Sequence, residues 1–103
     1  MKWDTKDHSD WRVVEYTGWR NIDNYGSFEE RAGVYIFANV DLQVKYIGKA
    51  GAGRIVDEIA SAINREKDKG ATKVKVLYTN SSDNATSLEK SLRDKYNPPN
   101  NLV

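Results

Sequence analysis

The sequence predicts one domain of the α/β class, of the α+β type, in which a β-hairpin and a third strand alternate with helices. Residues 33–48 hold two short runs rich in β-branched and aromatic residues, joined by five residues, which is typical of a hairpin. Residues 72–79 begin with alternating lysine and valine, which is typical of a strand with one exposed face. Apolar residues at helical spacing predict helices over residues 54–66 and 85–96.

The first 32 residues are predicted to form an extension packed on the core that residues 33–103 build. They hold all three tryptophans, and within them residues 11–16 alone have strand character. Ser27, followed three residues later by Glu30, predicts a helical turn with a capping box, which ends at Gly33. This turn would lead the chain into the first strand of the hairpin.

Turn residues set the boundaries of the later elements. Glycines at positions 48, 51 and 53 interrupt the strand pattern before the helix at 54–66, and Gly70 follows that helix. Residues 80–84 are a polar turn with several side chains able to cap the last helix, and Asn97 with two prolines after it ends that helix.

Composition excludes several function classes. The 16 Lys and Arg residues nearly balance the 15 Asp and Glu residues, and the net charge of +1 is too small to hold polyanions by bulk charge. The basic excess lies in residues 44–103. No cysteine and a single histidine, His8, exclude a disulfide framework, a thiolate zinc site and a serine triad. No apolar run approaches a membrane span and no signal-peptide pattern begins the chain, so we expect a cytoplasmic protein without membrane contact.

Glu89 is the most informative single position. It borders the apolar stripe of the last predicted helix, which consists of Ala85, Leu88, Leu92 and Tyr96. A carboxylate beside a buried face needs a partner, because desolvating it alone costs several kcal/mol. Its plain alternatives are an ion pair with a nearby lysine or arginine, or a side chain that extends to water; in a functional site the partner is a cation, a set of N–H donors or a metal ion.

Two glycine–tyrosine triplets lie in the predicted hairpin. Tyr35 comes two residues after Gly33, and Tyr46, eleven residues further on, comes two residues before Gly48. Plain core packing would also explain both rings. Together with the glycine-rich entry to a helix and the later run Ala-Thr-Ser-Leu-Glu at 85–89, followed by Leu, Tyr, Pro and Asn, the triplets resemble the GIY-YIG nuclease superfamily.

The resemblance implies a DNA endonuclease that uses Mg²⁺, or Mn²⁺, on a three-stranded antiparallel sheet flanked by helices. It implies Glu89 as the metal ligand, with Tyr46 and Tyr35 orienting or deprotonating the attacking water. A tyrosine has a pKa near 10 and acts as a base only where positive charge lowers that value. Lys49 and Arg54 are the cations placed to do so and are further candidate catalytic residues.

The remaining implied residues support the site or extend it. Asn101 matches the family's last asparagine and is expected to support the site by hydrogen bonds, while Gly33 and Gly48 are expected to allow close backbone approach. A DNA track would use the basic residues Lys49, Arg65, Lys73 and Lys75, joined by the nearby Lys67 and Lys69. Lysines on an exposed strand are also an ordinary protection against edge pairing, and both readings stay open.

One departure from the family pattern concerns catalysis. The family's arginine usually comes about eight residues after the second-triplet glycine, where this chain has Val56. The nearest arginine is Arg54, and one turn beyond it stands Glu58 in place of a histidine or tyrosine. An exposed arginine without a catalytic role is the plain alternative.

Two further hypotheses therefore stand beside the nuclease. A catalytically weak domain of this family would act as a DNA-binding or protein-binding module, and a stabilising interaction domain would use the tryptophan-rich N-terminus. For cleavage of both strands, a homodimer or a larger DNA-processing complex is expected, because one active site cuts one strand.

Overall fold

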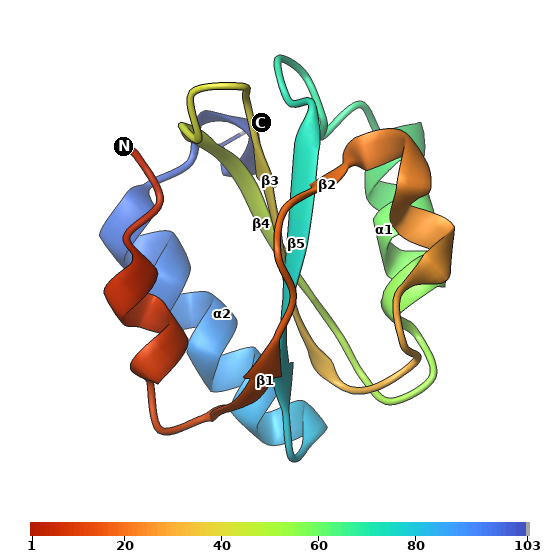
Figure 1. The fold of residues 1–103 in the computed structure, drawn as a ribbon, viewed down its shortest axis with the longest axis vertical. Helices are drawn as coiled ribbons and strands as arrows, with labels where there is room; N and C mark the ends of the chain where they lie inside the picture. Colours follow the sequence, from red (N-terminus) through yellow and green to blue (C-terminus); the bar gives the residue numbers. More distant parts are fainter. Residues whose placement is uncertain (103) are drawn as a thin grey trace.

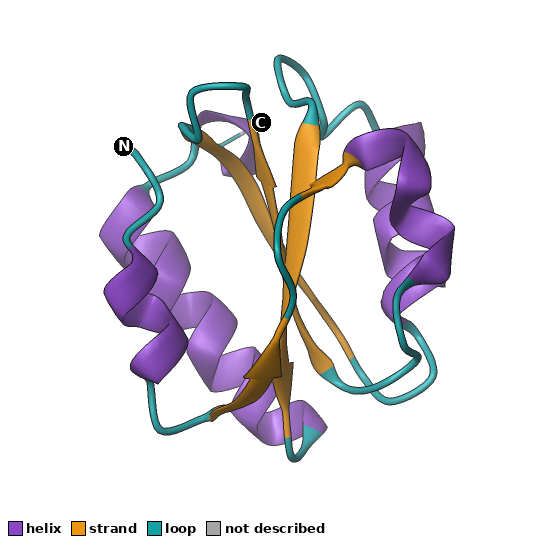
Figure 2. Ribbon diagram, in the orientation of Figure 1, coloured by secondary structure: helices purple, strands orange, loops and turns teal. Residues whose placement is uncertain are grey.

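The computed structural model describes residues 1–102 and shows one antiparallel sheet between two helical layers (Figure 1; Figure 2). The strands are β1 (Val13–Tyr16), β2 (Arg20–Asn21), β3 (Gly33–Ala38), β4 (Val44–Ala50) and β5 (Lys73–Thr79). The α-helices are α1 (Ile55–Asn64) and α2 (Ser82–Tyr96), and the 3₁₀-helices are η1 (Thr5–Ser9), η2 (Ile22–Ser27) and η3 (Pro99–Asn101). The α+β class is confirmed, as are the hairpin, the third strand and both α-helices, with ends shifted by a few residues.

The sheet order is β1-β5-β3-β4, and β2 also pairs with β5. The three predicted strands thus form its centre and one edge, while the N-terminal segment adds β1 and β2 on the far side of β5. In Figure 1, α2 and η1 cover one face, and α1 and η2 cover the other. Strand β4 is consequently an edge strand between α1 and α2. None of the described helices combines the length and the apolar character that a bilayer crossing requires.

The exposed face predicted for β5 is wrong at Lys75. This side chain is only 3% exposed, its Nζ lies 2.7 Å from His8 Nε2, and it lies over the ring of Trp19. The cause is long-range packing: η1 and β1 return to cover a face that the local Lys-Val alternation marks as polar. Lys75 is therefore not available to contact DNA, which corrects its place among the predicted nucleic-acid-binding residues.

The helical turn predicted from Ser27 is also wrong. A 3₁₀-helix precedes it at 22–27, and the following residues are irregular. Glu30 does not complete a capping box, because its Oε1 accepts the Val56 N–H of α1 at 2.9 Å. The residue before α1, Arg54, makes no side-chain cap of its own, so Glu30 supplies an acceptor that the start of α1 lacks.

Candidate functional site

The two triplet tyrosines lie on the face of the hairpin that packs against α1. Tyr35 is 1% exposed, its hydroxyl donates to the Glu58 carbonyl oxygen at 3.3 Å, and its ring centre lies 6.1 Å from that of Tyr46. Burial raises the pKa of Tyr35 above its ordinary value, and the neighbouring Tyr46 adds to this. The Tyr35 hydroxyl therefore suits a hydrogen-bond donor, and its surroundings do not favour the base role that the sequence also allowed.

Both triplet glycines lie where neighbouring atoms leave no room for a side chain. Gly48 is opposite Tyr35 in the β3–β4 pair, and a Cβ at Gly48 would overlap the Tyr35 ring. A Cβ at Gly33 would lie 2.6 Å from the Leu77 carbonyl oxygen. The absence of a side chain at Gly48 thus makes room for the Tyr35 ring against β4. This packing explains why the two triplets occur together.

Arg54 immediately precedes α1, four residues before Glu58, whose backbone carbonyl oxygen accepts from Tyr35. Its guanidinium forms ion pairs with Asp57 at 3.4 Å and with Glu58 at 3.2 Å, and the side chain is largely exposed. Glu58, at the position where the family has a histidine or tyrosine, therefore holds Arg54 in this structure. A phosphate that approaches Arg54 would compete with these exposed ion pairs.

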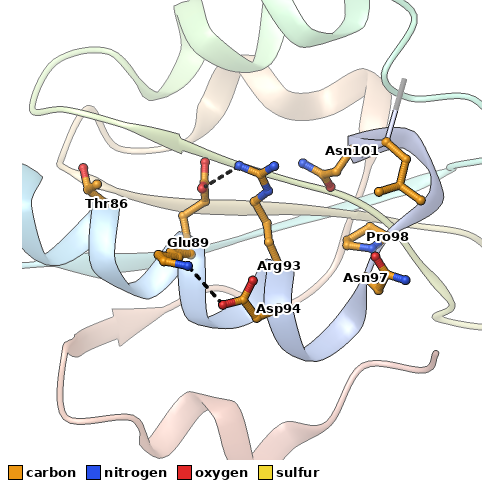
Figure 3. Close-up of a pocket in the computed structure, with 9 residues that line it drawn as sticks. Thr86, Glu89, Arg93, Asp94, Asn97, Pro98 and Asn101 are labelled. Atoms are coloured by element: carbon orange, nitrogen blue, oxygen red, sulfur yellow. Dashed lines mark hydrogen bonds and ion pairs between the residues drawn. The ribbon is translucent and has the colours of Figure 1, made fainter.

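Glu89 projects from α2 on the other side of the sheet. Its side chain is 14% exposed, and Oε1 lies 3.3 Å from Arg93 Nη1. Figure 3 shows this carboxylate beside the Arg93 guanidinium in a hollow that α2 and η3 line, with Asn101 on the same side. The hollow has a volume of about 490 Å³. The ion pair that the sequence offered as the plain partner of Glu89 is thus present in this structure.

Asn101 ties η3 to the edge strand. Its Oδ1 accepts the Ile47 N–H at 2.9 Å, and its Nδ2 donates to the Ile47 carbonyl oxygen at 2.9 Å. These are the two hydrogen bonds that a neighbouring strand would make, so one side chain satisfies the open edge of β4 at this residue. Both ends of the amide are occupied, which fits a supporting role rather than direct chemistry.

Lys49 lies near Glu89 rather than near the tyrosines. It follows Gly48 in β4, and its Nζ donates to Thr86 Oγ1 at 3.2 Å, on the α2 turn that precedes Glu89. The structure therefore divides the predicted site residues into two groups. Lys49, Glu89 and Asn101 lie on the α2 side of β4, whereas Tyr35, Tyr46 and Arg54 lie on its α1 side.

The other predicted DNA contacts are scattered. Arg65 is exposed just after α1, where its Nε donates to the Ser61 carbonyl oxygen at 3.3 Å. Its positive charge opposes the rise in the pKa of Tyr35 that burial causes. Lys73 is half-buried at the start of β5, between β2 and β3. Of these residues, Arg65 alone joins the group on the α1 side.

The donor set suits a cation that takes most of its ligands from water and substrate. Within residues 1–102, no three His, Cys, Asp or Glu side chains gather into a metal-binding group. Glu89 is one carboxylate in an open hollow, and Mg²⁺ commonly binds through one or two carboxylates, several waters and phosphate oxygens. The chain therefore fits a singly anchored Mg²⁺, with Arg93 as a competitor for the same carboxylate.

Arg93 is the site residue that the sequence reasoning missed. Its spacing of four residues from Glu89 is the helical spacing at which opposite charges meet, so the sequence carried a signal for this pair. The family pattern drew attention to Arg54 instead. The structure shows that Arg93 is the arginine in contact with the candidate metal ligand.

Comparison with known proteins gives matches among solved structures alone, since no family model and none of the curated proteins matches the sequence. The chain is 29% identical to the GIY-YIG N-terminal endonuclease domain of UvrC from Thermotoga maritima bound to magnesium, with a TM-score of 0.60 over 70% of this chain and 84% of that one. A variant of that domain with one asparagine changed to alanine also matches, at 29% identity and a TM-score of 0.60, over 70% and 83% of the two chains. A tyrosine-to-phenylalanine variant matches at 28% identity and a TM-score of 0.60, over 70% and 84%. Both variants are bound to the catalytic divalent cation.

Proposed function

This chain has the fold of the GIY-YIG superfamily, and we propose on that premise that it is a magnesium-dependent DNA endonuclease. The likeness to the UvrC nuclease domain supports a nuclease. The observation that carries the proposal is the placement of Glu89 in a hollow beside the edge strand β4, the strand that also bears Tyr46. Glu89, the candidate metal ligand, and Tyr46, the candidate water-orienting group, thus lie on the two sides of the same edge strand.

Phosphodiester hydrolysis requires a positioned water, neutralisation of charge on the phosphate, and a leaving 3′-oxygen. The water oxygen attacks phosphorus and loses a proton, the bond to the 3′-oxygen breaks, and the leaving oxygen takes up a proton to become a 3′-hydroxyl. Tyr46, which is 9% exposed, would orient or deprotonate that water. The buried Tyr35 ring lies next to that of Tyr46, and its raised pKa keeps its hydroxyl protonated, so its part would be to fix the Tyr46 ring by packing.

The charged residues complete the proposed site from both faces of β4. Glu89 would hold the cation, which when bound stabilises negative charge on the phosphate oxygens. Lys49 would approach the phosphate from the α2 side and Arg54 from the α1 side. A DNA backbone lying along the edge of β4 would meet both groups, and Asn101 keeps that edge closed to another strand.

Cleavage of plasmid and branched DNA by the purified chain with Mg²⁺ tests the proposal. Glu89→Gln keeps the size of the side chain and removes its charge, so it should abolish cleavage while the urea midpoint stays near that of the wild type. Lys90→Gln, a change at the adjacent exposed position, should leave cleavage largely intact. Cleavage that persists at the wild-type rate in Glu89→Gln would refute the proposed site.

A DNA-binding or protein-binding module with weak catalysis is the second candidate, and the ion pairs of Arg54 with Asp57 and Glu58 favour it. In these pairs the guanidinium of Arg54, the nearest candidate for the family's arginine, already contacts two carboxylates. Such a module would retain DNA without cutting it, with a slope of log K against log salt of a few units. Turnover in the wild type that disappears in Arg54→Ala would reject this candidate.

A further inference from the structure

Arg93 is the one cation in the described chain that contacts the Glu89 carboxylate. The Arg93 side chain is 47% exposed, whereas Glu89 is largely withdrawn from water. The same helix offers a comparison in Lys90 and Asp94, which pair at 3.3 Å with the same spacing, border the same hollow, and are both far more exposed. The Glu89–Arg93 pair therefore neutralises a partly desolvated charge, and the Lys90–Asp94 pair does not.

We propose that Arg93 is a positioning residue that neutralises Glu89 in the free protein and turns to a DNA phosphate when a divalent cation takes the carboxylate. This inference rests on the proposed function. It depends on one geometric fact, that the guanidinium lies 3.3 Å from Oε1 of the carboxylate that would hold the cation. A cation and a guanidinium on one carboxylate repel each other, so binding of the first weakens the hold on the second.

The released side chain stays at the site. Arg93 is anchored to α2, and its guanidinium opens onto the hollow, where the planar fork of donors suits a phosphate. When the Arg93 guanidinium leaves the Glu89 carboxylate and binds a phosphate, it remains paired with an anion. Because coupling between two ligands is reciprocal, the cation should strengthen DNA binding through Arg93, and DNA should strengthen binding of the cation.

The test measures Mn²⁺ binding to the full chain by calorimetry, without DNA and without turnover. Arg93→Gln removes the competing charge and should bind Mn²⁺ about three- to tenfold more tightly than the wild type. Arg93→Lys restores a cation at this position and should return the affinity toward the wild-type value. Lys90→Gln is the matched control and should stay within about twofold of the wild type.

A second measurement follows the coupling itself. Mn²⁺ should raise the affinity of the wild type for a short phosphorothioate duplex by a larger factor than it raises that of Arg93→Gln. Equal enhancement in the two proteins, or Mn²⁺ binding by Arg93→Gln that is no tighter than that of the wild type, overturns the inference.

Glu89→Gln separates this inference from the proposed function. If Glu89→Gln binds Mn²⁺ as the wild type does, the cation is not held at Glu89, and both proposals fail. If Glu89→Gln loses Mn²⁺ while Arg93→Gln gains nothing, the metal site stands and the role of Arg93 alone is wrong.

Discussion

Replacing Lys75 with methionine should remove a pH dependence of stability that this buried amine imposes on the fold. Lys75 lies in the middle of the sheet, beside His8 Nε2 and over the rings of Trp3, Tyr16 and Trp19. Burial lowers the pKa of Lys75 from 10.5 to about 8. The aromatic rings and His8 stabilise the charged amine of Lys75, but burial has removed most of its hydration.

The sign follows from proton binding in the two states. The folded chain releases the Lys75 proton more readily than the unfolded chain, so unfolding takes up protons between pH 8 and 10.5 and the free energy of unfolding rises with pH there. A change of this size in one pKa is worth about 3 kcal/mol over the whole window. Between pH 7 and pH 9.5 the expected gain is about 2 kcal/mol.

Urea unfolding of the wild type and Lys75→Met at these two pH values measures the effect. From pH 7 to pH 9.5 the free energy of unfolding of the wild type should rise by about 2 kcal/mol, and that of Lys75→Met by less than about 0.5 kcal/mol. At pH 7 the variant should be at least as stable as the wild type, because a buried charge is replaced by an apolar side chain of similar length. Keeping the upper limit at pH 9.5 leaves most unfolded tyrosines protonated, because their pKa is near 10.

Lys73→Met is the matched control, since Lys73 is half-buried in the same strand and lies outside the aromatic cluster. It should keep the wild-type gain between pH 7 and 9.5. An undiminished gain in Lys75→Met would show that the amine is not titrating in this window, and the account of its burial would have to be abandoned.

Three more changes test the packing at Gly48, the hydrogen bonds of Asn101 and the environment of His8. Gly48→Ala places a methyl group against the Tyr35 ring and should lower the free energy of unfolding in urea by about 1–3 kcal/mol. Asn101→Ala removes both hydrogen bonds to Ile47 and should cost about 1–3 kcal/mol, measured in the same way. Burial, with Lys75 adding, lowers the pKa of His8, so unfolding binds a proton below pH 6.5 and stability falls as pH drops; His8→Gln should flatten thermal melting midpoints between pH 5 and pH 7.

Each change has its own control. Gly26→Ala meets no atom within 4 Å and should leave stability within about 0.5 kcal/mol of the wild type. Equal losses in Gly26→Ala and Gly48→Ala would mean that crowding at Tyr35 is not the cause. Asn101→Asp keeps the acceptor and loses the donor, so stability equal to that of the wild type would contradict the role of the second hydrogen bond. A His8→Gln variant that still loses stability at pH 5 would assign the acid response to other groups.

The sequence predicted the parts of the fold that rest on local patterns. The hairpin strands and α1 follow from β-branched runs and from apolar spacing within a few residues, and their packing adds to these preferences rather than opposing them. Lys75 shows where such reasoning fails, because its environment is made by η1 and β1, far away in the sequence. The capping box predicted for Glu30 is wrong for the same reason, because its carboxylate oxygen accepts an N–H of α1 rather than one of its own turn.

The candidate site could be proposed from the sequence as a list of residues and not as an arrangement. The triplet tyrosines and Glu89 could be selected from the motif, but which face of β4 each one occupies depends on the strand pairing and on the packing of α1 and α2. The division into two groups changes the chemistry expected of them. Tyr35 becomes a packing residue, and Asn101 becomes a replacement for a missing strand.

The ion pairs of the free protein bear on the near-neutral net charge of +1. Arg54 and Arg93 both carry carboxylate partners, so neither is an unpaired charge that would attract DNA from a distance. A phosphate that binds either arginine competes with a carboxylate for the guanidinium, which lowers the net gain from each contact. A cation at Glu89 would remove that competition at Arg93 alone. If the proposed site is right, cation binding should therefore precede tight DNA binding, and the α2 side of β4, rather than the α1 side, should control it.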